Sequence, residues 1–331
     1  MKTCLVTGAT GAVGPRVVRA LSETGYRVRA LSLDAPVPGL FPEGVEVRLG
    51  DVTDAATVES ATVGVDTIFH LAALLHIVNP PPALREKYER VNVGGTGTVI
   101  ENAVRANTRR VVFFSTIAVY GGSSGQALTE ESPPRPDSFY AQTKLAAENL
   151  VLDAKRRDGQ PIGSVLRLGS VYGPRIKGNY RWLLKMLAAG RFLPLGSGCN
   201  RRTLVYDRDV ARAALLAAEH PAAAGRIFNI TDGQLHTMNE IISTICAALG
   251  HRPPRLRLPV APVRLAVGFL EDAMSLLGRQ SSIGRAMIEK YTEDAAVAGQ
   301  RVQAELGFVP RFDLMTGWRE TIDEMRQSGE L

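Results

Sequence analysis

Tyr140 and Lys144 are well placed to do chemistry, because they stand four positions apart at the start of a stretch with helical spacing. Side chains four residues apart meet on one face of a helix, so we expect the phenol and the ammonium to reach the same bound molecule. A free tyrosine has a pKa of about 10, and a neighbouring ammonium favours the phenolate. The pair therefore predicts a general base or acid that works near neutral pH.

Ser115 and Thr116 supply two hydroxyls at the end of the apolar run 111–114. In an open parallel sheet, ligands bind at the carboxyl ends of the strands. A hydroxyl at this position can form a hydrogen bond to a reacting oxygen and hold it near Tyr140. Capping of the strand end is the structural alternative.

Gly8, Gly11 and Gly14 form a triplet between a strand-like run and a helical pattern. Glycines permit a tight turn and let the backbone approach a pyrophosphate, while the N–H groups and dipole of the following helix favour the anion. The loop predicts a dinucleotide-binding site with contacts from Gly8, Thr10, Gly11, Ala12, Val13 and Gly14.

Ser32 occupies the position where an acidic residue normally holds the adenosine ribose and selects the unphosphorylated cofactor. Asp34 follows two residues later and could substitute for it if the loop turns back. A serine admits a 2′-phosphate, which Arg16 or Arg29 could balance. These residues do not decide between the two cofactors; we expect NAD, with NADP possible.

Short β-branched runs alternate with helical segments in the first half of the chain, which predicts an α/β fold with a doubly wound parallel sheet of the Rossmann type. Glycines and prolines interrupt this rhythm after about residue 172, which predicts a smaller mixed α/β lobe. We expect a cofactor-binding domain over 1–172, completed by segments near 203–231, and a substrate lobe mainly over 173–331. The expected strands are 2–7, 28–33, 45–49, 67–71, 110–115 and 163–168, and the expected helices of this half are 13–24, 84–107 and 140–157.

The composition favours small anionic ligands over nucleic acid. The 331 residues include 39 Lys and Arg against 33 Asp and Glu, a net charge of 39 − 33 = +6, and the two signs alternate along the chain. Cys4, Cys199 and Cys246 match neither a disulfide framework nor a metal-ligand spacing, so we expect no metal. With no signal-peptide pattern after Met1, we expect a cytoplasmic protein.

The segment 256–278 is the most apolar long stretch, but Arg257, Arg264, Glu271 and Asp272 make it unsuitable as a membrane span. It could lie on a membrane surface or cover a substrate. Most amphipathic helices pack on their own protein, so we do not expect membrane contact.

Seven motifs cover almost the whole chain and together resemble one family. They are the glycine triplet, Asp51-Val52, His70-Leu71-Ala72-Ala73, Val91-Asn92-Val93 with Gly95-Thr96, the run from Ser115 to Gly121, Tyr140 to Lys144, and Arg167 with residues 171–174. They resemble the extended short-chain dehydrogenase/reductases, in the branch of NAD(P)-dependent nucleotide-sugar epimerases, dehydratases and ketoreductases.

The resemblance implies that Thr116, Tyr140 and Lys144 are catalytic. It also implies that residues outside the glycine loop contact the cofactor, namely Ser32, Asp51, Val52, Leu71, Ala72, Ala73, Asn92, Ser115, Tyr140, Lys144 and Arg167. A likeness over 193–210 implies that Arg202 binds a diphosphate, and we add Asn179 and Thr116 on the substrate side. The alternative for Arg202 is a surface turn, with Asp207 and Asp209 as its partners.

The family's dehydratases carry an acidic pair after the catalytic threonine, whereas Ile117 and Ala118 stand here. The resemblance therefore favours a UDP-hexose C4 epimerase that works by hydride transfer through a 4-keto intermediate. An NADPH-dependent 4-ketosugar reductase of surface polysaccharide synthesis, a 3β-hydroxysteroid-like alcohol dehydrogenase and a non-catalytic dinucleotide sensor remain alternatives. The family resemblance also implies a homodimer, in which the helices over 84–107 and 140–157 of two copies form a four-helix bundle.

Overall fold

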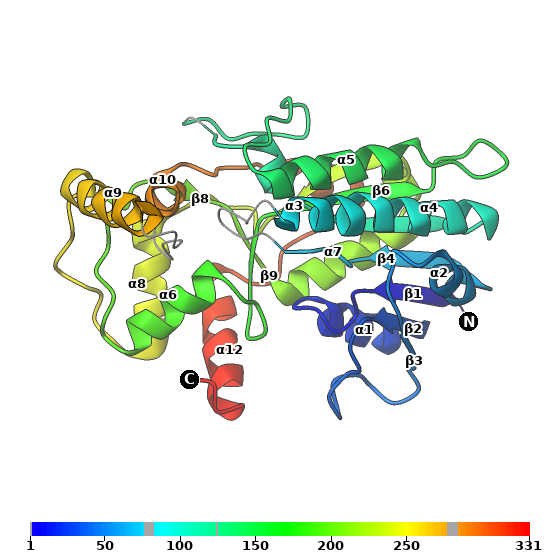
Figure 1. Ribbon diagram of the computed structural model, residues 1–331. Helices are drawn as coiled ribbons and strands as arrows, with labels where there is room; N and C mark the ends of the chain where they lie inside the picture. The colour runs from blue at the N-terminus through cyan, green and yellow to red at the C-terminus, as the bar shows by residue number, and fades with distance from the viewer. Residues whose placement is uncertain (1, 76–82, 124, 277–283) are drawn as a thin grey trace.

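A seven-stranded parallel sheet forms the centre of the computed structural model, which describes residues 2–75, 83–123, 125–276 and 284–331 (Figure 1). The strand order is β10-β6-β5-β4-β1-β2-β3, and it reverses between β1 and β4, where doubly wound sheets bind their ligands. The strands are β1 (Thr3–Thr7), β2 (Arg27–Ser32), β3 (Glu46–Leu49), β4 (Thr67–His70), β5 (Arg110–Thr116), β6 (Gly163–Leu168) and β10 (Arg226–Ile230). The predicted Rossmann fold class is confirmed.

Helices cover both faces of the sheet because its strands are apolar on both sides. On one face, α1 (Gly14–Glu23) packs beside α7 (Asp207–Glu219), and both share a core with β1 and β10. On the other face lie α2 (Ala55–Thr62), α4 (Gly95–Arg105) and α5 (Phe139–Asp153). In Figure 1, α4 and α5 lie side by side in the upper part of the view, and α1 lies lower, near β1 and β2.

The stretch 84–107, predicted as one helix, has three parts. A short helix α3 (Ala83–Tyr88) passes into a π-helical turn (Glu89–Gly94) and then into α4. The wider π turn adds a residue to the helix and places Asn92 in the interior, with its side chain 1% exposed. Periodicity does not reveal such a turn, because the apolar spacing before and after it is that of an ordinary helix.

The remaining elements gather at the opposite end of the molecule from the N-terminus (Figure 1). Tyr172 and Trp318 stack there in a second core. The second half of the chain contributes to both cores, since α7, β10 and α11 (Gln300–Leu306) pack on the sheet. The other elements are β7 (Ser170–Tyr172), α6 (Asn179–Ala188), β8 (Arg201–Arg202), β9 (Leu204–Tyr206), β11 (His236–Thr237), α8 (Met238–Leu249), α9 (Val260–Leu276), α10 (Arg285–Thr292) and α12 (Leu314–Gln327), with 3-10 turns at Ile117–Tyr120 and Pro221–Ala223.

Candidate active site

The glycine positions of the loop between β1 and α1 leave no room for a side chain. Gly8 has a φ of +68°, and a Cβ atom there would lie 2.7 Å from the amide nitrogen of Ala72. A Cβ on Gly14 would lie 2.2 Å from the carbonyl oxygen of Ala9. Helix α1 begins after Val13 without a side-chain cap, and Pro15 in its first turn has no N–H group that would need a partner. This geometry fits the pyrophosphate of a dinucleotide.

The end of β2 bears on the choice between NAD and NADP. Ser32 is buried and donates a hydrogen bond to the carbonyl oxygen of Asp34 at 3.0 Å. Both arginines considered as partners of a 2′-phosphate already form ion pairs with carboxylates. Arg16 pairs with Asp207 at 3.1 Å and with Glu324, whereas Arg29 pairs with Glu46 at 3.0 Å.

A chain of hydrogen bonds runs through His70 between β1 and the π turn. The Thr7 hydroxyl accepts from the amide of Ala72 at 3.3 Å and lies 2.7 Å from Nδ1 of His70. On the other side, Nε2 of His70 lies 3.0 Å from the Thr96 hydroxyl, which donates to the carbonyl oxygen of Asn92 at 2.6 Å. Hydrogen-bond matching therefore assigns the ring proton to Nε2. Burial, helped by the charge of Lys144, lowers the pKa of His70 to about 3, so the ring stays neutral.

Asn92 continues this chain to the catalytic helix. Its Oδ1 accepts from the amide of Leu74 at 2.8 Å, and its Nδ2 donates to the Thr143 hydroxyl at 3.1 Å. Thr143 donates in turn to the carbonyl oxygen of Tyr140 at 2.9 Å. Sequence reasoning did not identify this connection, although His70, Asn92 and Thr96 all stood in the motifs.

Tyr140 lies in the first turn of α5, which Ser138 caps by accepting from the amide of Ala141 at 3.3 Å. The ring is half-buried and packs edge-on against Tyr88, with the ring centres 6.4 Å apart. Burial, and then the proximity of Tyr88, raise the pKa of Tyr140 to about 12. Burial therefore outweighs the lowering of the Tyr140 pKa that we expected from Lys144.

Lys144 is buried one turn further along α5, and its Nζ lies 3.9 Å from the centre of the Phe113 ring. Burial lowers the pKa of Lys144 to about 7, although the carboxylate of Glu148 acts in the opposite direction. The aromatic face of Phe113 therefore does not make up for the loss of hydration of the buried ammonium.

Glu148 anchors a buried ion pair behind Lys144. Arg167 approaches it at 2.6 Å, with the two side chains 3% and 1% exposed, and Ser115 donates a hydrogen bond to the same carboxylate. The Arg167 guanidinium also lies 4.6 Å from the centre of the Tyr120 ring. Ser115 and Arg167 thus point into this network, and their direct contact with a cofactor stays a prediction.

Thr116 ends β5 half-buried, and its Oγ1 accepts from the amide of Ala118 at 3.1 Å. Because the oxygen acts as an acceptor there, its proton can be donated to a substrate oxygen.

The residues expected to contact the adenine and to line the cofactor lie after β3 and β4. Asp51 accepts a hydrogen bond from the amide of Thr53 at 2.9 Å, and Val52 is buried against Gly95. Leu71, Ala72 and Ala73 are half-buried beside the glycine loop.

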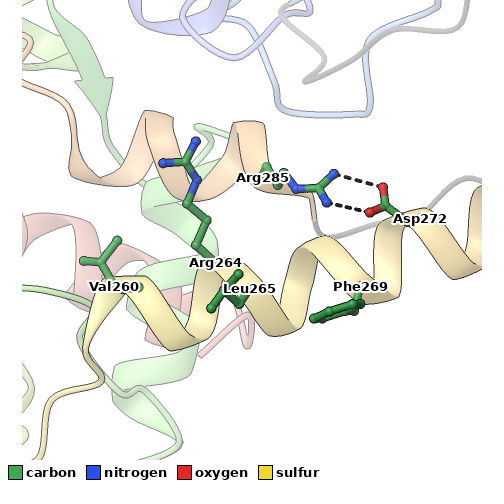
Figure 2. Close-up of a pocket in the computed structure, with 7 residues that line it drawn as sticks. Val260, Arg264, Leu265, Phe269, Asp272 and Arg285 are labelled. Atoms are coloured by element: carbon green, nitrogen blue, oxygen red, sulfur yellow. Dashed lines mark hydrogen bonds and ion pairs between the residues drawn. The ribbon is translucent and has the colours of Figure 1, made fainter.

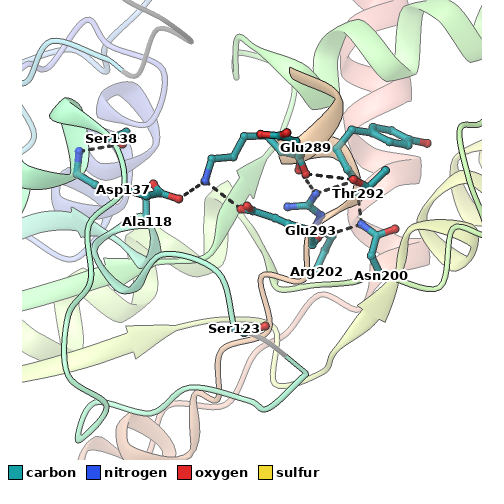
Figure 3. Close-up of polar contacts among 12 residues, drawn as sticks. Ala118, Ser123, Asp137, Ser138, Asn200, Arg202, Glu289, Thr292 and Glu293 are labelled. Atoms are coloured by element: carbon teal, nitrogen blue, oxygen red, sulfur yellow. Dashed lines mark hydrogen bonds and ion pairs between the residues drawn. The ribbon is translucent and has the colours of Figure 1, made fainter. Parts of the chain in front are cut away.

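On the substrate side, Arg202 reaches from β8 to the end of α10 (Figure 3). Its Nη2 donates to the carbonyl oxygens of Lys290 and Tyr291, the latter at 2.9 Å, while its buried Nε has no hydrogen-bond partner in the described part of the chain. Asn179 is exposed at the first residue of α6.

Asp207 and Asp209, the partners considered for Arg202 in a surface turn, are used elsewhere. Asp207 binds Arg16, whereas Asp209 binds Arg212 at 2.6 Å and accepts from two backbone amides. The surface-turn interpretation is wrong in its partners.

A contact that sequence reasoning missed joins α10 to the loop before Tyr140. Nζ of Lys290 lies 2.6 Å from Asp137 and 3.0 Å from Glu293. Both carboxylates are labelled in Figure 3. Partial burial opposes the charge, but the hydrogen bonds from both carboxylates raise the pKa of Lys290 overall. No sequence spacing links positions 137 and 290, so only the fold brings them together.

The reversal of strand order at a glycine loop, with a tyrosine and a lysine one helical turn apart beside it, defines a dinucleotide-binding Rossmann protein with an oxidoreductase-type site. The model of the NAD dependent epimerase/dehydratase family matches residues 4–231, and the chain belongs to this family. The predicted resemblance to the extended short-chain dehydrogenase/reductases is confirmed.

Relatives of known name extend along nearly the whole chain. It is 26% identical to the N-acetyl-alpha-D-glucosaminyl-diphospho-ditrans,octacis-undecaprenol 4-epimerase of Escherichia coli O157:H7, over 96% of this chain and 93% of that protein. It is 29% identical to a 3 beta-hydroxysteroid dehydrogenase/Delta 5-->4-isomerase of Mycobacterium tuberculosis (strain CDC 1551 / Oshkosh), over 93% and 86%. The solved structure of MoeE5 in complex with UDP-glucose and NAD superposes with a TM-score of 0.77, at 29% identity over 98% of this chain and 99% of that one.

Proposed function

We propose that this protein is an NAD-dependent C4 epimerase of a nucleotide-activated hexose. The observation that carries the proposal is the placement of Tyr140 and Lys144 one turn apart on α5, the helix packed on the β5 strand that ends in Thr116. Relatives named as sugar 4-epimerases and a neighbour solved with a UDP-sugar support the choice of substrate class.

The residues of the chain fit NAD as the cofactor. The glycine loop and the uncapped start of α1 would hold the pyrophosphate, Asp51 and Val52 the adenine, and Lys144 the nicotinamide ribose. The commitment of Arg16 and Arg29 to carboxylates disfavours a 2′-phosphate, and so disfavours NADP. When bound, NAD supplies a reversible acceptor for the hydride of the sugar C4 carbon.

The protein's own residues would then manage the proton and the oxygen. Tyr140 takes the proton from the C4 hydroxyl and returns it after the keto sugar has presented its other face. Thr116 donates a hydrogen bond that stabilises the negative charge developing on that oxygen. Lys144, buried beside Phe113, provides the positive charge that makes proton removal from a phenol of high pKa possible.

The surroundings of Thr116 disfavour elimination of water. Ile117 is buried and packs against Val119 and Tyr120, where a dehydratase of this family would place an acid. On the substrate side, the unpartnered Nε of Arg202 fits a diphosphate oxygen, because buried donors seek an acceptor. Asn179 would contact the same part of the substrate.

The decisive experiment is turnover of UDP-glucose and UDP-N-acetylglucosamine without added reductant. We expect formation of the C4 epimer with NAD in catalytic amounts only, and a loss of about 100-fold or more in kcat for Tyr140→Phe. Consumption of one NADPH per 4-keto sugar would instead show a reductase, and NAD-dependent oxidation of a 3β-hydroxysteroid would show an alcohol dehydrogenase. Ligand binding without any turnover would favour the sensor.

We further propose a cytoplasmic homodimer. The outward face of α5 carries the half-exposed Leu150, which lies against Gly97 of α4. Small and apolar groups at this position fit close packing of the same two helices of a second copy. The described cysteines, Cys4, Cys199 and Cys246, are free thiols, which suits a reducing compartment.

A further inference from the structure

Helix α9 is covered on only one side. Figure 2 shows Arg264 and Arg285 on the side where α10 lies, and Leu265 and Phe269 on the side away from it. Arg285 pairs with Asp272 at 2.6 Å, and Arg264 pairs with Glu289 at 2.7 Å, so ion pairs hold the two helices together. Val263 and Val267 of α9 are partly buried, whereas Leu265 and Phe269 are not covered by α10.

The uncovered side is strongly apolar. Leu265 and Phe269, four residues apart, are 65% and 75% exposed, and Leu270 is 50% exposed. Leu256 and Leu258, in the segment before the helix, are 75% and 39% exposed. An open hollow of about 800 Å³ is lined by Leu265 and Phe269 together with Val260, Ala261, Arg264, Asp272 and Arg285. Single exposed leucines are ordinary, but several exposed apolar side chains within one short segment mark an interaction surface.

The same stretch is strongly basic. Residues 251–270 contain Arg252, Arg255, Arg257 and Arg264 and no acidic residue. Arg252 and Arg255 are exposed, while Arg257 anchors the segment by donating to Asn239 at 2.8 Å. Backbone hydrogen bonds between Leu258 and Pro194 and between Gly196 and Leu258 fix the segment further.

We propose that this basic-apolar face, formed by Arg252, Arg255, Leu256, Leu258, Leu265, Phe269 and Leu270, docks on the surface of an anionic phospholipid bilayer. Such a surface offers phosphates to the arginines and acyl chains to the leucines and phenylalanine, which is the pairing an interfacial amphipathic helix needs. A second copy of the chain is disfavoured as the occupant, because two-fold contact would bring the same arginines face to face. None of the helices in the described ranges is long and apolar enough to cross a bilayer, so α9 would lie along the surface.

The sequence alone favoured packing of this segment on its own protein. The structure changes that preference because it leaves Leu265, Phe269 and Leu270 exposed, although Val263 and Val267 of the same helix are partly buried. Residues 277 and 278 of the expected segment lie outside the described residues.

The proposal is tested by sedimentation of the full-length protein with sucrose-loaded vesicles of phosphatidylcholine alone and of phosphatidylcholine with 30% phosphatidylglycerol, a composition of about one anionic lipid in three. We expect binding to the anionic vesicles only, weakened by added salt. R252Q/R255Q should weaken binding about 25-fold, since each arginine near the surface contributes about fivefold. L265S/F269S should weaken it at least about tenfold.

Matched controls separate this face from the rest of the surface. R19Q/R27Q removes two exposed arginines, one from α1 and one from β2. Val309→Ser removes an apolar side chain that is 66% exposed. Both control proteins should bind anionic vesicles as the wild type does. The proposal is overturned if wild type stays in the supernatant with anionic vesicles, or if the controls lose as much as L265S/F269S. It is also overturned if L265S/F269S lowers the molecular mass in solution while vesicle binding is unchanged, which would identify a subunit interface.

Discussion

The ammonium of Lys144 lies inside the protein against the ring of Phe113, a residue of a different element. The sequence showed the four-residue spacing between Tyr140 and Lys144, and it predicted that the ammonium would favour the phenolate. The sequence did not show that burial raises the pKa of Tyr140 and lowers the pKa of Lys144, because Tyr88 and Phe113, which surround them, come from other elements of the fold. Single residues were thus predictable in kind, but their ionisation was not.

Lys144→Met tests this balance. The folded-state pKa of about 7 lies below the ordinary 10.5, so the unfolded chain binds more protons between these pH values, and wild-type stability rises with pH in that window. At pH 6 the variant should be more stable than wild type by on the order of a few kcal/mol, and the difference should shrink toward pH 10. Urea unfolding at several pH values measures this.

The same variant should lose activity while it gains stability. Turnover should fall by roughly 100-fold, and its pH dependence should shift upward, because the phenol of Tyr140 loses its cationic neighbour. Lys144→Arg, which keeps the charge, is the control. Stability curves that run parallel at all pH values, or an unchanged pH profile of turnover, would remove Lys144 from the proposed role.

At the scale of elements, the alternation of strands and helices in the first half was predictable, because buried parallel strands and amphipathic helices carry distinct patterns. The expected strand 110–115 appears as β5 (Arg110–Thr116) and the expected helix 140–157 as α5 (Phe139–Asp153). The π turn within 84–107 was missed, since its defining feature is the i→i+5 pattern of backbone hydrogen bonds and not a spacing of apolar residues.

His70 of β4 forms hydrogen bonds with Thr7 of β1 and Thr96 of α4, so its replacement tests how firmly these three elements are coupled. Burial depresses its pKa from 6.5 to about 3, so wild-type stability is lost as pH falls below 6.5. His70→Gln removes this titration. Between pH 6.5 and pH 5, wild type should lose about 2 kcal/mol more unfolding free energy than His70→Gln loses.

Denaturant unfolding of both proteins at the two pH values gives the comparison. His220→Gln is a control in a partly exposed histidine of the loop after α7. Equal losses in wild type and His70→Gln would mean that the imidazole is accessible to protons in the folded state.

At the scale of the whole molecule, the lobe formed by the second half was predicted only in outline. Its contacts join distant positions, as Lys290 joins Asp137, and its helices have no motif that fixes their place. The proposed homodimer belongs to this scale as well.

Leu150→Glu should convert the dimer to a monomer. A carboxylate on the shared face of α4 and α5 would have to be buried without a partner in the dimer, a cost that typically exceeds what such a contact gains. Light scattering at micromolar concentration measures the mass, and Val47→Glu is the control at an exposed apolar residue of β3. A wild type that is already monomeric contradicts the proposal.

The ion pairs that Arg16 forms with Asp207 and Glu324 join distant parts of the sequence. Arg16 lies in the first turn of α1, directly after the glycine loop, whereas Asp207 begins α7 and Glu324 lies in α12. Without α12, Arg16 would keep one of these two carboxylates. A deletion of that late helix would therefore be felt at the beginning of the helix that follows the glycine loop.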